Sequence, residues 1–379
     1  MKRSYYSFLI FLILYLNRGY SFAQSMFNPD ISIIPRFRLE SNDGTQLPGK
    51  RIFNRPEFSL EEFELAFQSY LNPYARADIF LTKPGVGDEP VEIEEIYATF
   101  LRGLPFALNA RIGKYRAEFG KLNSVHPHAW PFISQPLSLE RFIGEEGLND
   151  MGISISGVIP TGEKVYTKLT FDVLKGDAIG TIDRESGNMS GGIGLTGDGN
   201  ENYYANSGRL MTFLPVGANS DLEFGISGLT GIHDPHYKYR FYYGNLDFKY
   251  KWKPNSYKSL ILQGELLLNK RKFHLPNELS RYNSQTVSSQ GGYLYGDYQF
   301  HKIFSIGARY DWAQSPYSKD DKAEGMALFL GYYPVEETAA FRLQYQITKF
   351  FPLAMDKYSI NMIALQFMFS MGPHKAHPF

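Results

Sequence analysis

An uninterrupted alternation of apolar and polar side chains marks the stretch Phe341-Arg342-Leu343-Gln344-Tyr345-Gln346-Ile347-Thr348. Successive side chains of a β-strand point to opposite faces, so a period of two predicts a strand with one apolar face and one polar face. An amphipathic helix would instead repeat its apolar residues every three to four positions. The same alternation recurs along the chain, for example over 165–173 and 246–252. The stretch therefore predicts a fold built from two-faced strands.

Sixteen segments of this kind are predicted, and many of them are ten residues or longer. They lie near residues 31–40, 57–70, 74–83, 91–102, 105–115, 151–160, 164–174, 205–215, 220–230, 238–252, 257–269, 291–301, 303–313, 324–333, 337–348 and 359–371. Strands of soluble sandwiches have about five or six residues, whereas a tilted strand that crosses a bilayer needs about 9–11. A soluble sandwich would explain the alternation but not the length, so the lengths favour a membrane-spanning barrel.

The links between these segments alternate in length. Every second link is short, such as 71–73 and 161–163, and link 103–104 between the fourth and fifth segments is of this kind. The other links are mostly longer: 41–56, 84–90, 116–150, 175–204, 231–237, 270–290, 314–323 and 349–358. Alternate links of an antiparallel meander lie at the same end of the sheet, and short turns opposite long loops are typical of outer-membrane barrels. We therefore predict an all-β fold, a transmembrane antiparallel up-and-down β-barrel of about 16 strands with periplasmic turns and extracellular loops.

The composition excludes several other classes of protein. The chain of 379 residues has no cysteine, which excludes a disulfide scaffold, thiol catalysis and cysteine-ligated metal sites. It has 39 Lys and Arg against 39 Asp and Glu, and a net charge of zero argues against a nucleic-acid partner. The 27 Tyr and 30 Phe residues suit the aromatic girdles at the two surfaces of a membrane, so lipid of the outer membrane is the expected partner.

The N-terminus has the layout of a secretory signal peptide. Lys2 and Arg3 precede the short apolar run 8–16, and the small residues Ser21 and Ala23 follow at cleavage-site spacing. Residues 1–23 are the predicted signal peptide, and 24–379 form the predicted barrel. A retained N-terminal anchor is the alternative. Together with the barrel pattern, a cleaved signal peptide predicts the outer membrane of a bacterial cell.

Two segments resemble the phosphate-selective type of porin. One is Arg111-Ile112-Gly113-Lys114-Tyr115-Arg116-Ala117-Glu118-Phe119-Gly120, and the other is Leu148-Asn149-Asp150-Met151-Gly152-Ile153. This resemblance implies a sixteen-strand porin, often a homotrimer, whose third extracellular loop folds into the pore. Loop 116–150 occupies that position and is predicted to constrict the pore. Its prolines and aromatic residues independently suit a packed loop that keeps its shape without strand pairing.

Charged residues on the predicted lumen faces are the candidate pore-lining residues. The positive ones are Arg76, Arg111, Lys168, Lys249, Lys251, Arg309 and Arg342. The negative ones are Glu62, Glu64, Asp78, Asp172, Asp221, Glu223, Asp247, Glu265, Asp297 and Asp311. Rings of charge set the selectivity of a pore, so seven positive residues against ten negative ones predict a mixed or weakly cation-preferring channel. Most of these charges are expected to pair across strands.

Histidine pairs are the second candidate site. The pairs are His126 with His128, His233 with His236, and His374 with His377. Neutral imidazole is the commonest metal ligand in proteins, and without cysteine a zinc site would use histidine and carboxylate. The first and last of these segments also resemble outer-membrane proteins described as zinc-regulated. Surface histidines without a ligand role are the competing interpretation.

These observations leave three hypotheses for the function. The first is a porin, a non-enzymatic channel through which small hydrophilic solutes or ions diffuse. The second is a zinc-binding or zinc-responsive outer-membrane uptake protein, for which zinc would be the one cofactor. The third, a hydrolase using His233 and Asp234, has little support because no nucleophile motif accompanies the pair.

Overall fold

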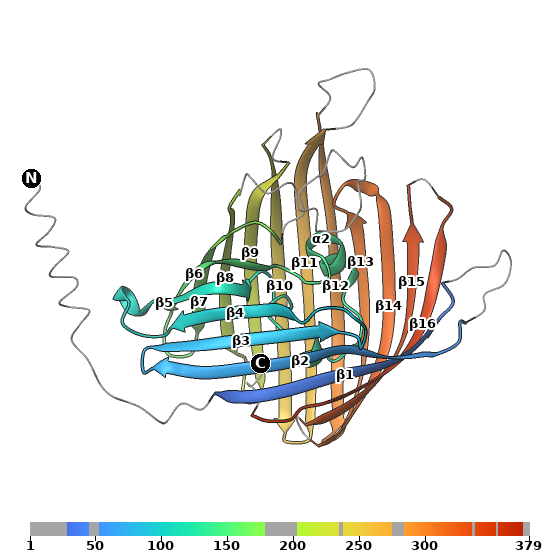
Figure 1. The fold of residues 1–379 in the computed structure, drawn as a ribbon, viewed down its shortest axis with the longest axis horizontal. Coiled ribbons are helices and arrows are strands. Elements are labelled where there is room, and N and C mark those ends of the chain that lie inside the picture. Colours follow the sequence, from blue (N-terminus) through green and yellow to red (C-terminus); the bar gives the residue numbers. More distant parts are fainter. Residues whose placement is uncertain are drawn as a thin grey trace, which may run out of the picture.

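A closed antiparallel β-barrel forms the whole described part of the chain (Figure 1). The computed structural model describes residues 29–44, 53–178, 203–234, 238–274, 284–335, 338–353 and 355–373. Within these ranges each strand pairs with its neighbours in sequence, and the last strand pairs with the first. The sixteen-strand barrel predicted from the alternation is confirmed. The predicted signal peptide, 1–23, lies outside the described residues and stays a prediction.

The strands are long, as the sequence pattern predicts. They are β1 (Asp30–Asn42), β2 (Glu57–Asn72), β3 (Ala75–Pro84), β4 (Glu92–Phe100), β5 (Asn109–Arg116), β6 (Asn149–Pro160), β7 (Tyr166–Leu174), β8 (Ala205–Pro215), β9 (Ser220–Asp234), β10 (Tyr239–Asn255), β11 (Lys258–His274), β12 (Ser284–His301), β13 (Phe304–Ser315), β14 (Ser318–Val335), β15 (Ala339–Phe351) and β16 (Tyr358–Phe369). The helical segments are η1 (Pro105–Ala107), η2 (Pro127–Ala129) and α2 (Leu137–Ile143). None of the helices in the described ranges has the length and apolarity to cross a membrane.

The two faces of the sheet differ as the alternation requires. On β14, Leu328 is 51% exposed and Leu330 is 47% exposed on the outer face, whereas Phe329 between them is 1% exposed and points inward. Lipid offers no hydrogen-bond partner for backbone amides and carbonyls, so an open sheet edge is not tolerated there. The pairing of β1 with β16, from Arg36 opposite Met368 to Asn42 opposite Met362, removes that edge.

A row of stacked aromatic rings crosses six adjacent strands from β13 through β16 and β1 to β2. It consists of Phe304, Tyr332, Phe341, Phe367, Phe37 and Phe58. Neighbouring ring centres lie between 4.6 Å and 6.3 Å apart. Phe58 is 70% exposed and Phe304 is 40% exposed, so the row lies on the outer face. Exposed aromatic rows of this kind suit a lipid-facing wall.

The connections follow the predicted parity, but several differ in length from the prediction. The predicted loops 231–237, 270–290, 314–323 and 349–358 are shorter, because the flanking strands extend into them; the β13–β14 turn consists of Pro316 and Tyr317 alone. In these segments the strands remain paired through their backbones beyond the residues at which apolar and polar side chains alternate. The predicted short link 103–104 spans 101–108, because η1 precedes β5. The ends of the barrel chain, Asp30 and Phe369, lie at the same end of the barrel as the short turns, as an even number of strands requires.

Candidate functional site

The segment between β5 and β6, residues 117–148, lies inside the barrel and is called the inner loop below. Near its start, the Leu122 amide donates to Glu265 Oε1 on β11 at 2.7 Å. Lys121 Nζ lies 2.7 Å from Glu223 Oε2 on β9. These partners are inward-facing side chains more than a hundred residues away along the chain. The start of the inner loop is therefore fixed to the β9–β11 wall.

The middle of the inner loop is bonded to a second sector of the wall, β13 to β15. The Ile133 amide donates to Gln344 Oε1 at 2.7 Å. Arg309 Nη1 donates to the Ser134 carbonyl oxygen at 2.5 Å, and the Arg309 guanidinium lies 4.4 Å from the ring centre of Phe132. Figure 1 shows α2 of this loop beside β12 and β13. Because the loop leaves the wall at β5 and is bonded to β13, on the other side of the closed ring of strands, it lies across the lumen.

The inner loop carries an apolar core of its own. Phe119, Phe132 and Phe142 are each no more than 1% exposed. The ring of Phe132 packs edge-on against Tyr295 with centres 5.2 Å apart, and the ring of Phe142 lies 5.9 Å from that of Tyr243. Burial of each such side chain stabilises the loop by about 1.5–3 kcal/mol. This packing replaces the strand pairing that the loop lacks, and it fixes the shape of the space left in the lumen.

The two ends of the inner loop are tied together. The Leu148 amide donates to Asn123 Oδ1 at 2.8 Å, and Asn123 Nδ2 donates to the Ala117 carbonyl oxygen at 2.8 Å. Arg116, at the end of β5, donates to Glu94 Oε1 on β4 at 2.6 Å. The loop therefore leaves and re-enters the wall at a closed, hydrogen-bonded base.

Several residues predicted to line the pore face the lumen as ion pairs. Arg76 lies 2.9 Å from Asp78, and Arg309 lies 2.8 Å from Asp311. Lys168 lies 2.6 Å from Glu118 of the inner loop. Burial raises the pKa of the Glu118 carboxyl, but Lys168, Arg111 and Thr170 together outweigh that effect, so the pKa lies below its usual range.

The remaining predicted pore-lining residues have other partners. Asp247 accepts two hydrogen bonds from Arg209. Asp172 accepts one from the Tyr115 hydroxyl at 3.1 Å, and Arg111 lies 4.7 Å from the ring centre of Tyr97. Glu265 accepts from the loop, as described above, and Glu223 pairs with Lys121 of the loop. Glu62 pairs with Arg36, Glu64 lies beside the histidines described below, and Asp221 lies opposite Lys251 in the pairing of β9 with β10. The last four, Lys249, Lys251, Asp297 and Arg342, line a cavity described below.

Sequence reasoning missed three charged residues that take part in these contacts. Arg209 shares the polar face of β8 with Ser207, and the period of two over that strand was the signal that could have found it. Glu118 and Lys121 belong to the inner loop, where no period assigns a face. Their positions follow only from how the loop folds.

A cavity of about 330 Å³ lies on the side of the inner loop nearer the chain ends and the short turns. Among the described residues, its charged lining consists of Lys121, Lys249, Lys251 and Arg342 against one carboxylate, Asp297. Arg342 also donates to the carbonyl oxygen of His128 at 2.7 Å, so the cavity reaches the inner loop. Its charge is mainly positive.

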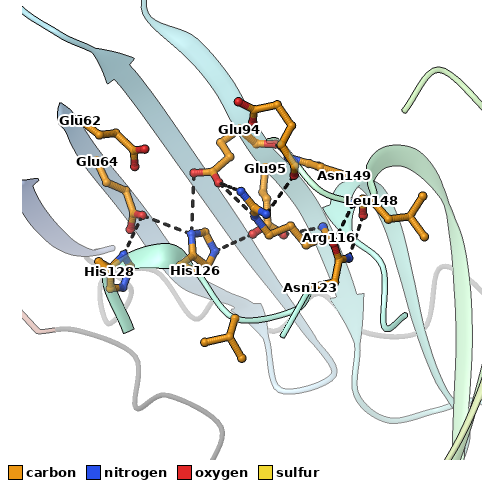
Figure 2. Close-up of polar contacts among 12 residues, drawn as sticks. Glu62, Glu64, Glu94, Glu95, Arg116, Asn123, His126, His128, Leu148 and Asn149 are labelled. Carbon is orange, nitrogen blue, oxygen red and sulfur yellow. Dashed lines mark hydrogen bonds and ion pairs between the residues drawn. The ribbon is translucent and has the colours of Figure 1, made fainter. Parts of the chain in front are cut away.

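Of the predicted histidine pairs, His126 and His128 lie together beside a group of glutamates (Figure 2). The Nδ1 atoms of His126 and His128 each lie 3.2 Å from Glu64 Oε2 on β2. His126 Nδ1 also lies 3.7 Å from Glu94 Oε2, and His126 Nε2 lies 2.7 Å from Glu95 Oε1, both on β4.

Burial and charge act on these two histidines with different outcomes. Burial lowers the pKa of the His126 imidazole, but the carboxylates of Glu64, Glu95 and Glu94 outweigh it and hold that pKa well above its usual range. Burial, with the charges of His126 and Arg36, lowers the pKa of His128 by more than Glu64 raises it, so that pKa lies below its usual range. The surroundings therefore favour the charged form of His126 and the neutral form of His128.

The structure brings together no second histidine pair within the described residues. His233, on β9, is fully buried, and its Nε2 lies 2.7 Å from the carbonyl oxygen of Lys272. His236, His374 and His377 lie outside the described residues, so their predicted ligand role stays a prediction.

Solved structures with a similar fold include a bacterial outer-membrane channel, an anion-selective porin and another bacterial outer-membrane protein. The outer-membrane channel DcaP of Acinetobacter baumannii matches with a TM-score of 0.59 at 10% identity, over 92% of this chain and 99% of that one. An anion-selective porin from Comamonas acidovorans matches with a TM-score of 0.56 at 10% identity, over 91% and 100%. OmpT of Vibrio cholerae in its trimer form matches with a TM-score of 0.53 at 8% identity, over 92% and 100%. The likeness to porins predicted from the sequence is thereby confirmed for the fold.

Comparison of the sequence itself is less informative. No protein-family model matches the chain. A protein of Aquifex aeolicus (strain VF5), described as uncharacterized, is 29% identical over 399 residues, covering 94% of this chain and 81% of the relative. None of the proteins named here is described as zinc-regulated, so that resemblance gains no support.

Proposed function

We propose that this protein is a porin of the bacterial outer membrane, a non-enzymatic channel through which small hydrophilic solutes or ions diffuse. One observation carries the proposal. The barrel is closed, its outer wall is apolar and its lumen is lined by charged residues. A folded loop that is hydrogen-bonded to the wall narrows that lumen. The inner loop then sets the size of the solutes that pass.

The charge of the passage follows from how its residues pair. Counting lumen faces predicts a mixed or weakly cation-preferring pore. However, Asp78, Asp247 and Asp311 are each bonded to an arginine, which reduces their effect on a passing ion. The cavity beside the inner loop keeps an excess of lysine and arginine. Unbalanced charge along a pore attracts the opposite ion, so we propose a preference for anions at this end of the channel.

A homotrimer in outer-membrane lipid is the proposed assembly. The fold is shared with OmpT, which is described in a trimer form. The exposed aromatic row from Phe304 to Phe58 gives the barrel a wall that either lipid or a neighbouring barrel can cover. Chemical cross-linking in outer-membrane vesicles, followed by denaturing electrophoresis, is expected to give a ladder that ends at three chains.

Recording from planar bilayers tests the channel itself. Because the chain has no cysteine, a single introduced thiol is the only one that a methanethiosulfonate reagent can label. Lys251→Cys places that thiol at the cavity. A bulky reagent added from the side of the short turns is expected to reduce the conductance of this variant. Purified protein that gives no conductance steps at all would remove the proposal.

The matched control is Leu246→Cys on the same strand, β10. Leu246 is 46% exposed on the outer face, so labelling there leaves the lumen unchanged. A block of equal size in both variants would mean that the current does not pass through the barrel interior.

A further inference from the structure

The contact between the inner loop and the β2–β4 wall has the geometry of a cation site. His126 Nδ1 and His128 Nδ1 each lie 3.2 Å from the same oxygen, Glu64 Oε2. Two ligands bound to zinc at about 2.05 Å in a tetrahedral arrangement lie about 3.3 Å apart. One nitrogen from each histidine and one oxygen of Glu64 can face a common point within 4.8 Å of one another. The spacing therefore matches a metal centre that these three side chains share.

Hydrogen bonding leaves several of these buried atoms unsatisfied. Glu64 Oε2, Glu94 Oε2 and His126 Nδ1 have no well-aligned hydrogen bond among the described residues. Glu64 and Glu94 are 3% and 6% exposed. Buried polar atoms are rarely left without a partner, since each such atom costs free energy. When the lone pairs of neighbouring atoms all point at one place between the groups, the atoms lie close together but are poorly aligned for hydrogen bonding with one another.

Negative charge gathers at this place. The carboxylates of Glu64, Glu94 and Glu95 lie beside His126 and His128 (Figure 2). Arg36 pairs with Glu62, Arg116 pairs with Glu94, and Arg342 donates to the carbonyl oxygen of His128. Among the described residues no arginine forms an ion pair with Glu64 or Glu95, so a cation is favoured beside the two imidazoles.

A second layer of bonds already orients the proposed ligands. His126 presents Nδ1 to Glu64 while its Nε2 lies 2.7 Å from Glu95 Oε1. A carboxylate on the far nitrogen of a ligating histidine fixes the tautomer and makes the ligand more basic. Glu95 is held in turn by the backbone amide of Arg116 at 3.1 Å, and Arg116 Nη2 holds the other oxygen of Glu94 at 2.6 Å.

We propose that Glu64, His126 and His128 form a binding site for a divalent transition metal of the zinc class. The two histidines belong to the inner loop, and Glu64 belongs to β2. A bound ion therefore joins the loop to a different sector of the wall from the one that carries Arg309 and Gln344. It acts as a cross-link that holds the inner loop in place, and the proposal does not depend on what passes through the barrel.

The donor set selects the class of ion. Two imidazoles and one carboxylate suit zinc, whereas calcium and magnesium prefer sites made of oxygen alone.

Zinc binding to the full chain tests the proposal. The protein is purified in detergent without a polyhistidine tag, in a background carrying His236→Ala, His374→Ala and His377→Ala, so that neither of the other two predicted histidine pairs is present. Isothermal titration with zinc chloride is expected to give one ion per chain. Cobalt(II) is expected to give the intense visible bands of a tetrahedral site, and zinc is expected to raise the Tm until EDTA is added.

Substitutions then assign the ligands. Glu64→Gln and His128→Gln keep the size of the side chains and are expected to weaken zinc binding by at least about 100-fold. Glu95→Gln changes the residue that orients His126, and it is expected to weaken zinc binding by about 10-fold to 100-fold. His301→Gln, at an exposed position at the end of β12, is the matched control and is expected to leave the affinity unchanged. Heat-modifiable migration on gels confirms that each variant still forms the barrel.

Two results would overturn the proposal. One is the absence of stoichiometric zinc binding by the folded background protein. The other is an unchanged affinity and an unchanged gain in Tm in Glu64→Gln, which would place the ion elsewhere. Should Glu64→Gln fail to fold, Glu64→Asp is the second variant. It keeps the carboxylate but shortens the side chain, and it is expected to lose the tetrahedral cobalt bands that the background protein gives.

Discussion

Lys121 Nζ lies 2.7 Å from Glu223 Oε2, and this ion pair joins the inner loop to β9 inside the barrel. The side chains of Lys121 and Glu223 are 11% and 8% exposed. Removal of either side chain would therefore leave its partner as a buried charge without a counter-ion of its own. Arg209 lies 3.8 Å from Glu223 and compensates only in part. The inner loop is thus held to the wall by electrostatics as well as by its apolar core.

Removing one partner of this pair is expected to destabilise the barrel. Lys121→Met should lower the free energy of unfolding by about 3 kcal/mol, because a buried charge left without its partner is costly. The double variant Lys121→Met with Glu223→Gln should lose less than the sum of the two single losses. Urea titration of the protein in lipid vesicles measures all three values. Strict additivity would show that the two charges do not interact.

Loosening the middle of the inner loop is expected to widen the channel. Arg309 donates to Ser134 and covers the ring of Phe132, so Arg309→Met removes the hydrogen bonds while keeping most of the apolar contact. Single-channel recording should show larger steps and more current noise. Leu328→Ala on the outer face is the control. Equal conductance in Arg309→Met and the wild type would mean that the loop does not limit the current.

Reversing the charge of the cavity is expected to change which ion is preferred. Lys249→Glu with Lys251→Glu exchanges two of its positive residues for negative ones. The reversal potential in a potassium chloride gradient should then shift from the anion side towards the cation side. Lys249→Met with Lys251→Met should fall between the two. A reversal potential that is the same in all three proteins would show that the cavity does not lie on the path of the ions.

A side chain at Gly113 is expected to prevent correct pairing of β4 and β5. Gly113 has a φ of 138°, and a Cβ at this position would lie 2.1 Å from the carbonyl oxygen of Ile96. Gly113→Ala should therefore destabilise the barrel by at least about 2 kcal/mol, since both the backbone conformation and the contact are unfavourable. Gly228→Ala, with no atom within 4 Å of the added Cβ, should fold normally. Heat-modifiable migration after refolding distinguishes them, and equal yields of folded protein would contradict the prediction.

The sequence alone determined the strands, their number and the order of their pairing. Residues such as Phe341 to Thr348 alternate because one face of each strand meets an apolar surrounding and the other does not. That requirement is local, and it repeats at every second residue, so it can be read without knowing which strands are neighbours. The parity of the links then determined the topology. The lengths of link 103–104 and of the loops over 231–237, 270–290, 314–323 and 349–358 were not predicted, because pairing there depends on the backbone and not on an apolar pattern.

Only the tertiary structure decided what the charged residues do. The sequence named His126 and His128 as a pair of candidate metal ligands and Glu64 as a candidate pore-lining residue. That Glu64 meets the pair depends on how the inner loop crosses the lumen, which brings together residues more than sixty positions apart. The loop has no period that assigns its side chains to a face, and its path is set by many weak contacts made at once, among them Lys121 with Glu223 and Phe132 with Tyr295. Long-range contacts of this kind leave no local pattern in the chain, because each depends on the closed barrel that surrounds it.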